Sequence, residues 1–279
     1  MSKIWKLIRE YGVDGIVLVV VGIVFIVPFA FILLIGSKSP QEAGLFQFSW
    51  PSEFRLWENL VGVIQTNNYQ MALALRNSIV LTVASVTLIV LFSALVAYVM
   101  QRRNDRLATL VNSIMFAGLV LPPAVVPTIF WMQTLGIYKT MISLIFIEVA
   151  LALPFSTLIL RAFIGTIPRE IDEAAIIDGA SPTRLFLSVI LPLLRPAIVT
   201  IIVTSSVAIY NDFSNPLYFL PGAKNVTAQM TLFNFMSQYS SQWNMVFADV
   251  VLITIPPLIL FMFFQKQIVA GMTSGAVKG

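Results

Sequence analysis

Apolar runs of about twenty residues constrain this chain more than any other feature. The first extends from Gly15 to Gly36 without a charged residue. A helix of that length crosses the roughly 30 Å hydrocarbon core of a bilayer, where only helices and closed barrels satisfy their backbone polar groups. The runs are continuous rather than alternating, which favours helices. With 58% hydrophobic residues, 11% charged residues and a mean hydropathy of +0.90, the sequence predicts an all-α membrane protein.

Six apolar runs predict six transmembrane helices. The third contains Pro122, Pro123 and Pro127, so we expect it to be kinked or partly unwound. A cleaved signal peptide is the alternative for the first run. That run is longer than a typical signal core and no small-x-small cleavage site follows it, which favours an uncleaved helix. The predicted helices cover residues 15–36, 75–100, 109–132, 140–164, 193–213 and 244–265.

The positions of lysine and arginine predict the orientation. With the N-terminus in the cytoplasm, twelve of the 17 basic residues lie inside, as the positive-inside rule requires, and both termini are cytoplasmic. The predicted order is a cytoplasmic N-terminus (1–14), the first helix (15–36), an extracytoplasmic loop (37–74), a five-helix core (75–265) and a cytoplasmic tail (266–279). The inside residues are Lys3, Lys6, Arg9, Arg102, Arg103, Arg106, Arg161, Arg169, Arg184, Arg195, Lys266 and Lys278; the outside residues are Lys38, Arg55, Arg76, Lys139 and Lys224.

A polar island, residues 166–192, interrupts the core on the cytoplasmic side. Thr166 can cap a helix start, and Pro168 suits a first helical turn. Gly179 accepts the left-handed conformation that ends a helix, and Ser181-Pro182 begins a second helix by the same capping logic. Acidic residues near the start of the first helix complement its dipole; they are Glu170, Asp172 and Glu173.

The two short helices would form an elbow, from which Leu191-Pro192 returns the chain to the membrane. We expect Ile171, Ala174 and Ala175 on one face of the first helix, where adjacent alanines allow another protein to approach closely. The alternative is an amphipathic connector lying on lipid. Such helices carry basic residues on their polar face, whereas this one is acidic and anionic lipid would repel it. The sign of the charge favours a protein partner.

Composition excludes several chemistries. The chain has no cysteine and no histidine, which excludes disulfides, thiolate nucleophiles, histidine bases and zinc sites built from these ligands. It contains no Gly-Lys dipeptide and therefore no phosphate-binding P-loop. We predict a subunit that is not itself an enzyme and binds no cofactor or metal. The net charge of +4 reflects loop charges, so we expect no nucleic-acid partner.

The island resembles the EAA loop of ABC importer permeases. That pattern is Glu-Ala-Ala, three residues, Gly, nine residues, Ile, any residue and Leu-Pro. Here Glu173-Ala174-Ala175, Gly179 and Leu191-Pro192 stand at these spacings, and Val189 replaces the usual Ile. In that family the loop forms coupling helices that sit in a cleft of a cytoplasmic ATPase. The resemblance implies that the ATPase contact is made by Glu173, Ala174, Ala175, Asp178, Gly179, Leu191 and Pro192.

Other segments resemble the smaller six-span subunit of maltose-type carbohydrate permeases. They are the tail 268–279, Arg76-Asn77-Ser78, and Asn211-Asp212 with Tyr210 in place of the usual Trp. The resemblance implies a type I ABC importer permease fold, a sugar or oligosaccharide substrate and a bacterial or archaeal plasma membrane. The implied partners are a second homologous permease, a cytoplasmic ATPase dimer that binds ATP and Mg, and an extracytoplasmic sugar-binding protein. The tail residues that would touch the ATPase are Gly271, Ser274, Gly275 and Gly279.

Charged residues within the predicted helices are candidates for the translocation pathway. Glu148 and Asp249 fall inside the fourth and sixth helices, where an ionisable group must face protein or water. The alternative is a position near a helix end, or pairing with Ser and Thr inside the bundle. Tyr210, Asn211 and Asp212 end the fifth helix, where Asp212 either lines the pathway or only caps the helix. Two further hypotheses are an ABC importer of a non-sugar solute and a proton-coupled secondary transporter that uses Glu148 and Asp249.

Overall fold

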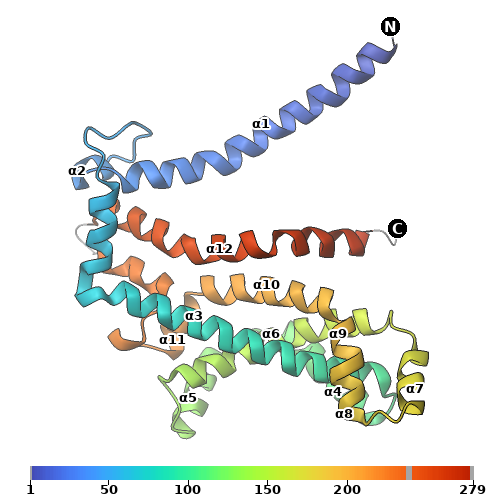
Figure 1. The fold of residues 1–279 in the computed structure, drawn as a ribbon. Helices are drawn as coiled ribbons and strands as arrows, with labels where there is room; N and C mark the ends of the chain where they lie inside the picture. Colours follow the sequence, from blue (N-terminus) through green and yellow to red (C-terminus); the bar gives the residue numbers. More distant parts are fainter. Residues whose placement is uncertain (1, 237–240, 277–279) are drawn as a thin grey trace. The chain divides into compact units, whose positions relative to one another are not determined.

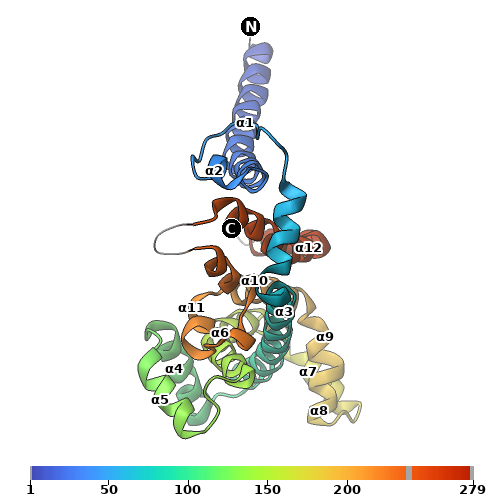
Figure 2. The ribbon, with the colours of Figure 1, turned by 90° about the vertical axis from the view of Figure 1, so that its left-hand side faces the viewer.

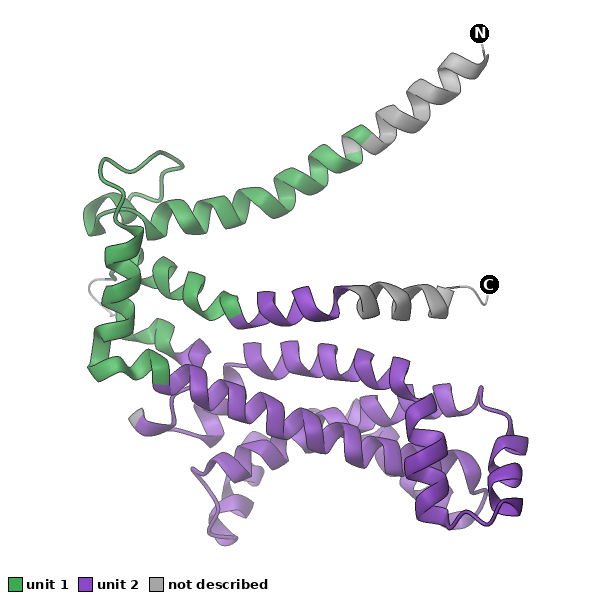
Figure 3. Ribbon diagram, viewed as in Figure 1, with its two compact units in different colours: residues 1–72, 231–255 green, residues 73–230, 256–279 purple. Residues whose placement is uncertain are grey.

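The computed structural model describes residues 2–236 and 241–276, which are helical almost throughout (Figure 1). Within these residues the only β pairing is an isolated bridge between Met236 and Ser241. The predicted all-α class is therefore confirmed. The chain forms two compact units, which Figure 3 colours separately: unit 1 comprises residues 1–72 and 231–255, and unit 2 comprises residues 73–230 and 256–279.

Three elements, α3, η3 and α12, contribute residues to both units. The other elements lie within one unit or at its edge. In chain order the elements are α1 (Ser2–Gly36), α2 (Pro40–Ala43), α3 (Leu56–Arg102), α4 (Arg106–Val120), α5 (Val125–Thr134), α6 (Met141–Ile164), α7 (Arg169–Ile177), α8 (Pro182–Arg184), the π-helical η1 (Leu185–Ile190), α9 (Leu191–Leu193), α10 (Arg195–Asn211), α11 (Ser214–Phe219), the 3₁₀ turns η2 (Ala223–Asn225) and η3 (Ala228–Phe235), and α12 (Trp243–Ala276).

A buried amide network joins three helices within unit 1. The Asn59 Nδ2 group donates to the carbonyls of Gly36 at 2.8 Å and Lys38 at 3.0 Å. Asn244 Nδ2 donates in turn to Asn59 Oδ1 at 3.0 Å. Gly36 permits this close packing, since a Cβ there would lie 3.2 Å from the backbone nitrogen of Ala248. The end of α1 and the first turns of α3 and α12 are thereby held at one point.

Helix α6 is central in unit 2, where it contacts α4, α10 and α11. Figure 2 looks along the long helices and shows α4 and α5 on one flank of α6, with α7, α8 and α9 on the opposite flank. The core shared by α3, α6, η1 and α10 is aliphatic. Its fully buried members include Leu81, Ile89, Leu144, Leu160, Ile164, Ile190, Leu194 and Ile201.

The helices that are long and apolar enough to cross a membrane overlap the predicted ones, with some different bounds. Among the described residues, four helices are long and apolar enough to cross a bilayer: Val17–Gly36, Leu56–Arg102, Met141–Ile164 and Trp243–Gln265. Two bent pairs bring the number to six if each pair is one span. These pairs are Arg106–Val120 with Val125–Thr134, and Pro182–Leu193 with Arg195–Asn211.

The third predicted helix is broken, which confirms the expected disruption by proline. Helices α4 and α5 meet at an angle of 120°, and residues 121–124 between them contain Pro122 and Pro123. A proline disfavours the helical conformation of the residue before it. Accordingly, Leu121 is extended, with φ of −76° and ψ of 129°. The angle of 120° is much larger than a proline kink within one continuous helix, so α4 and α5 are two separate helices.

Helices also form outside the predicted spans. The segment 37–74, predicted as an extracytoplasmic loop, contains α2 and the first turns of α3. Helix α3 is interrupted at Thr66–Tyr69, where Asn67, Asn68 and Tyr69 have positive φ. Helix α12 continues to Ala276, through most of the predicted tail. Hydrophobicity therefore located the long apolar helices. It did not predict the helical turns in the more polar segments, because those segments carry no long apolar run.

Candidate functional site

The first helix of the island, α7, begins at Arg169 with Pro168 in the cap position. The predicted cap by Thr166 is wrong. Its hydroxyl instead donates to the Phe163 carbonyl at 2.8 Å and so completes the last turn of α6. The chain is still leaving α6 at this residue, so the cap position falls later, on a proline that has no side-chain acceptor. Two of the three expected acidic residues, Glu170 and Asp172, occupy the first turn of α7, and Glu173 follows directly after it.

The end of α7 is a glycine-centred stop, as predicted. Gly179 has φ of +78°, a conformation that costs glycine little and other residues more. Its amide donates to the Ile176 carbonyl at 3.0 Å, and the Ala180 amide donates to the Ala175 carbonyl at 2.9 Å. These two bonds form a Schellman motif, which satisfies carbonyls that a helix end would otherwise leave unpaired. The corner of the island is thus fixed by backbone hydrogen bonds.

The second half of the island is a composite helix formed by α8, η1 and α9. Ser181 caps it, as predicted, by accepting from the Arg184 amide at 3.3 Å. The composite helix then meets α10 at 73°. The break falls at Leu194, two residues after Pro192, because Pro196 stands in the first turn of α10 and fixes where that helix begins. The chain does turn after the second helix of the island, as predicted, but the turn lies at Leu194 and not at Leu191-Pro192.

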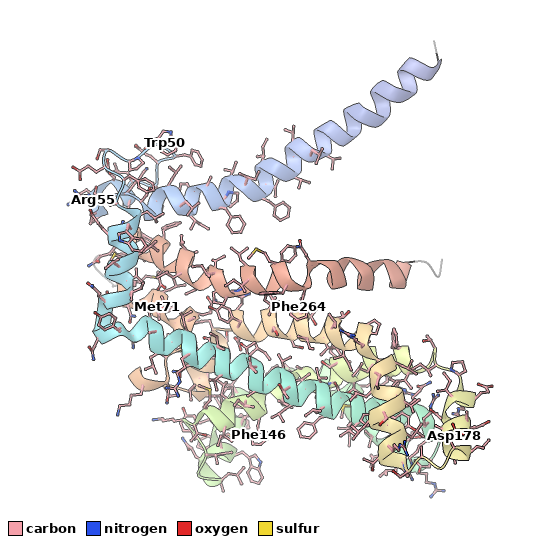
Figure 4. The ribbon with its side chains drawn as sticks, in the orientation of Figure 1. Trp50, Arg55, Met71, Phe146, Asp178 and Phe264 are labelled. Carbon is pink, nitrogen blue, oxygen red and sulfur yellow. The ribbon has the colours of Figure 1, made fainter. Side chains whose placement is uncertain are left out.

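The orientation of α7 differs from the predicted one. Ile171 and Ala175 pack against the core, while Ala174 is exposed beside Glu173. The predicted single contact face of Ile171, Ala174 and Ala175 is therefore wrong, because Asp172 turns inward and rotates Ala174 to the outside. Figure 4 shows the side chains of this end of unit 2, with Asp178 labelled. The exposed face comprises Glu170, Glu173, Ala174, Ile176, Ile177, Asp178 and Gly179; Ile176 is 59% exposed and Ile177 is 84% exposed.

A buried ion pair attaches α7 to α3. Arg102 Nε lies 2.5 Å from Asp172 Oδ2, and the two side chains are only 14% and 12% exposed. Arg102 Nη2 also donates to the Ile167 carbonyl at 3.3 Å. From the sequence alone, Arg102 is expected to lie in a loop that orients the chain and Asp172 to complement the helix dipole. The pairing was missed because no local signal links residues so far apart in the chain.

A second arginine joins α6 to α4 and α3. From α6, Arg161 Nη1 donates to Asn112 Oδ1 in α4 at 2.5 Å, and Arg161 Nε donates to Gln101 Oε1 in α3 at 3.2 Å. Nearby, the rings of Tyr98 and Phe186 pack against each other with centroids 5.4 Å apart and planes tilted by 46°, and so connect α3 with η1. The island therefore sits on a rigid base.

At the other end of unit 2, residues of α6, α10 and α11 line a cavity of about 480 Å³. Glu148 of α6 is 5% exposed and lines it. Asn215 Nδ2 donates to Glu148 Oε1 at 3.1 Å. Asp212 Oδ1 accepts from the Ser214 amide at 2.8 Å, so this carboxylate both caps α11 and lines the cavity. Of the predicted pathway residues, the structure brings together Glu148 and Asp212.

The remaining pathway candidates lie elsewhere. Tyr210 is buried and lines a separate, apolar cavity of about 190 Å³. Asn211 accepts from Gln229 Nε2 at 3.1 Å and is exposed. Asp249 belongs to unit 1, where it is fully buried and accepts from the Thr231 hydroxyl at 3.1 Å. Within unit 2, Tyr210 therefore lies in a different cavity from Glu148 and Asp212.

The Arg76-Asn77-Ser78 motif holds the chain segment that follows α11. Asn77 Nδ2 donates to the carbonyls of Lys224 at 3.3 Å and Val226 at 2.9 Å. The Ser78 hydroxyl accepts from the Ala228 amide at 2.8 Å. The sequence suggested a family likeness for this motif but not its role, because its partners lie far away in the chain.

The predicted tail contacts fall at the end of the described chain. Helix α12 includes the backbone of Gly271, Ser274 and Gly275 in its last turns. Gly279 lies outside the described residues. Their contact with an ATPase stays a prediction.

Comparisons with known proteins agree with this arrangement. Residues 89–274 match the family described as "Binding-protein-dependent transport system inner membrane component". The chain is 33% identical over 206 residues to the melibiose/raffinose/stachyose import permease protein MelC of Bacillus subtilis, covering 73% of this chain and 75% of MelC. It is 30% identical to the trehalose/maltose transport system permease protein MalG of Thermococcus litoralis, covering 97% of this chain and 99% of MalG.

The diacetylchitobiose uptake system permease protein NgcG of Streptomyces coelicolor is also 30% identical, with 97% of this chain and 90% of NgcG covered. Among solved structures, a chain of a bacterial ABC transporter that imports the acidic polysaccharide alginate superposes with a TM-score of 0.80. Its identity is 19%, and 94% of this chain and 97% of that chain are covered, which shows a shared fold. By its fold and by the extent of the sequence match, the chain belongs to the family of inner membrane components of binding-protein-dependent transport systems.

Proposed function

We propose that this chain is one of two permease subunits of an ATP-driven ABC importer and forms half of the pathway for a sugar or oligosaccharide. The relatives named above are import permeases for melibiose, raffinose, stachyose, trehalose, maltose and diacetylchitobiose. Membership of a binding-protein-dependent family argues against the proton-coupled alternative. The likeness to several saccharide permeases favours a sugar over a non-sugar cargo.

The observation that carries the proposal is the exposed face of α7. Ile176 and Ile177 leave large apolar side chains in water, and such a patch marks a contact surface. Asp172 is neutralised by Arg102, so the outward charge comes mainly from Glu170, Glu173 and Asp178. An apolar patch with an acidic rim fits a protein groove with basic edges. It fits an anionic lipid surface poorly.

The coupling contact would consist of Glu173, Ala174, Asp178 and Gly179 on the exposed face, together with Ala175, Leu191 and Pro192 behind it. Closure of the ATPase would push on α7. The Schellman motif at Gly179 and the Ser181 cap keep the angle between α7 and α8 fixed. The Arg102–Asp172 pair would carry the displacement to α3, and the composite helix would carry it to α10. Movement of packed helices as rigid bodies is the usual form of alternating access.

The remaining partners follow from this role. A second homologous permease would complete the pathway, and an extracytoplasmic sugar-binding protein would deliver the substrate. A cytoplasmic ATPase dimer would bind ATP and Mg, for which this chain has no P-loop. Both termini would lie in the cytoplasm of a bacterial or archaeal cell, and the tail residues Gly271, Ser274, Gly275 and Gly279 would contact the ATPase.

The proposal is tested by removing the apolar contact without disturbing the fold. Ile177→Ser should weaken ATPase binding to the detergent-solubilised permease by at least about tenfold, because the loss of one large buried side chain costs about 1.5–3 kcal/mol. It should leave the melting temperature unchanged, since the residue is 84% exposed. Leu45→Ser, at a residue that is 64% exposed in the predicted extracytoplasmic loop, is the matched control.

In proteoliposomes containing a cognate partner permease, ATPase and binding protein, the wild type should take up labelled raffinose, maltose or diacetylchitobiose with ATP. Equal ATPase affinity for Ile177→Ser and Leu45→Ser, or uptake without ATP, would contradict the proposal.

A further inference from the structure

Six of the eleven residues that line the cavity at the α11 end of unit 2 are polar. Its volume of about 480 Å³ falls in the range of small-molecule sites. Phe155, which is 58% exposed, adds an aromatic face to the lining. The polar lining residues are Glu148, Ser156, Thr204, Ser205, Asp212 and Asn215.

Two of the serines have hydroxyls without a partner. Ser156 is 2% exposed and Ser205 is 9% exposed. Both line the cavity, yet neither side chain makes a hydrogen bond to another described residue. Elsewhere in the same helices a hydroxyl bonds back to the preceding turn, as Thr204 does to the Thr200 carbonyl at 2.9 Å. Neither oxygen is among the fully buried polar atoms of the described residues that lack a partner, so both hydroxyls open into the cavity and can donate to or accept from a molecule inside it.

The charge of the cavity has one sign. Glu148 and Asp212 are carboxylates, and no lysine or arginine is among the lining residues. Carboxylates accept hydrogen bonds, whereas serine, threonine and asparagine can both donate and accept. This set suits the many hydroxyl groups of a saccharide. A uronic acid or other anionic sugar would instead place its charge beside this acidic pair with no lysine or arginine in the lining to compensate.

We propose that this cavity is a saccharide contact site within the pathway and that it selects uncharged sugars over acidic ones. The inference rests on the proposed importer function and adds the class of substrate. Glu148 and Asp212 would accept from sugar hydroxyls, Ser156 and Ser205 would bond ring or glycosidic oxygens, and Phe155 would pack on a sugar face. Alginate, the cargo of the structurally similar transporter, is acidic, so the shared fold would here carry the opposite selectivity.

The absence of cysteine from the chain gives a direct test. Ser156→Cys and Ser205→Cys each introduce a single thiol of nearly the same size into the cavity. In the assembled importer, the rate of thiol modification is measured with a cationic and an anionic methanethiosulfonate reagent. The same rates are measured in a Glu148→Gln/Asp212→Asn background. Protection is measured with raffinose, maltose and diacetylchitobiose as uncharged probes, trigalacturonate as an acidic probe and spermidine as a cationic probe.

The cationic reagent should react at least about tenfold faster than the anionic one, as expected for a site that concentrates cations. This preference should fall toward unity in the Gln/Asn background. At least one uncharged sugar should slow the labelling, whereas trigalacturonate should not. Equal reagent rates, protection by trigalacturonate, protection by spermidine alone, or no protection by any uncharged sugar would overturn the inference. The second cysteine position keeps the test decisive if one variant fails to fold.

Uptake assays separate this inference from the proposed function. Ser156→Val should reduce sugar uptake at least fivefold while the loaded binding protein still stimulates the ATPase. The matched control is Ser113→Val in α4, whose serine does not line the cavity. If ATP-driven sugar uptake is robust but the cysteines are unprotected, the importer proposal stands and the inference fails. If no sugar is taken up with ATP, the importer proposal itself fails.

Discussion

The two ends of unit 2 depart from the usual partition of side chains in opposite ways. At the island, large apolar residues such as Ile177 face outward. At the cavity, polar residues such as Glu148 and Ser156 are buried. Each departure indicates what the surface contacts: apolar residues exposed in water fit a protein partner, and polar residues buried in a cavity fit a polar solute. A rigid aliphatic core connects the two ends, so a displacement at one can reach the other.

The largest expected effect comes from breaking the attachment of the island. Arg102→Leu would leave Asp172 buried and unpaired, which should lower the free energy of unfolding by about 3–5 kcal/mol. The matched control is Arg103→Leu, whose partner Asp105 is exposed; an exposed pair contributes about 0–1 kcal/mol. Thermal unfolding in detergent measures both variants.

A double variant, Arg102→Leu/Asp172→Leu, should recover much of that stability, because it removes the buried charge altogether. It should not recover the coupling of ATPase activity to the loaded binding protein, since the rigid attachment is gone. If Arg102→Leu and Arg103→Leu proved equally stable, apolar packing alone would attach the island, and the comparison between the two ends of unit 2 would lose the rigid connection on which it depends.

The contrast also explains how far the sequence could predict the molecule. The spans, the Gly179 stop and the Ser181 cap were predictable, because hydrophobicity and capping act over a few residues. The Arg102–Asp172 pair was not, nor was the contact of Glu148 with Asn215, 67 residues away. Sequence periodicity identifies a helix but does not fix its rotation against a neighbour.

The rotation of α7 illustrates that limit. Ile171 and Ala174 are three residues apart, and a helical pattern alone places both on one side. Tertiary packing selected Ile171 and turned Ala174 outward. The cavity was harder to predict than the rotation of α7. Serines occur at many positions of the apolar helices, and no spacing in the sequence distinguishes Ser156 and Ser205 from the others. Its two carboxylates were nevertheless among the predicted pathway residues, because charge within a span is rare enough to notice.

An intermediate effect is expected from strain at the corner of the island. Gly179→Leu should cost about 1–2 kcal/mol, since a residue other than glycine is disfavoured at φ of +78°. The surrounding space is open, so the protein should still fold and insert. Gly136 offers a matched control outside the island, with φ of +70° and equally open surroundings.

Both glycine variants should therefore lose similar stability. Only Gly179→Leu should abolish stimulation of the ATPase by the loaded binding protein, because only there does the altered turn move a contact surface. Full transport by Gly179→Leu, or equal uncoupling by Gly136→Leu, would show that the fixed angle between α7 and α8 is not required.

The smallest effect concerns a surface charge near the island that has no part in the proposed contact. Asp105 caps α4: its Oδ1 accepts from the Ala108 amide at 2.9 Å. That hydrogen bond, with help from Arg103, holds the pKa of Asp105 below its usual value of 3.8. Since the charged form is favoured in the folded state, its stabilising contribution is complete above pH 3.8 and is lost as the pH falls further.

The melting temperature of wild type minus that of Asp105→Asn should therefore be constant from about pH 8 to about pH 5 and shrink only in more acidic solution. ATPase coupling, measured in the neutral range, should be unchanged by Asp105→Asn. A change in coupling would mean that the acidic character of this end acts as a diffuse field rather than through the α7 face. In that case the exposed face of α7 could no longer be treated as a contact surface separate from the charged residues around it.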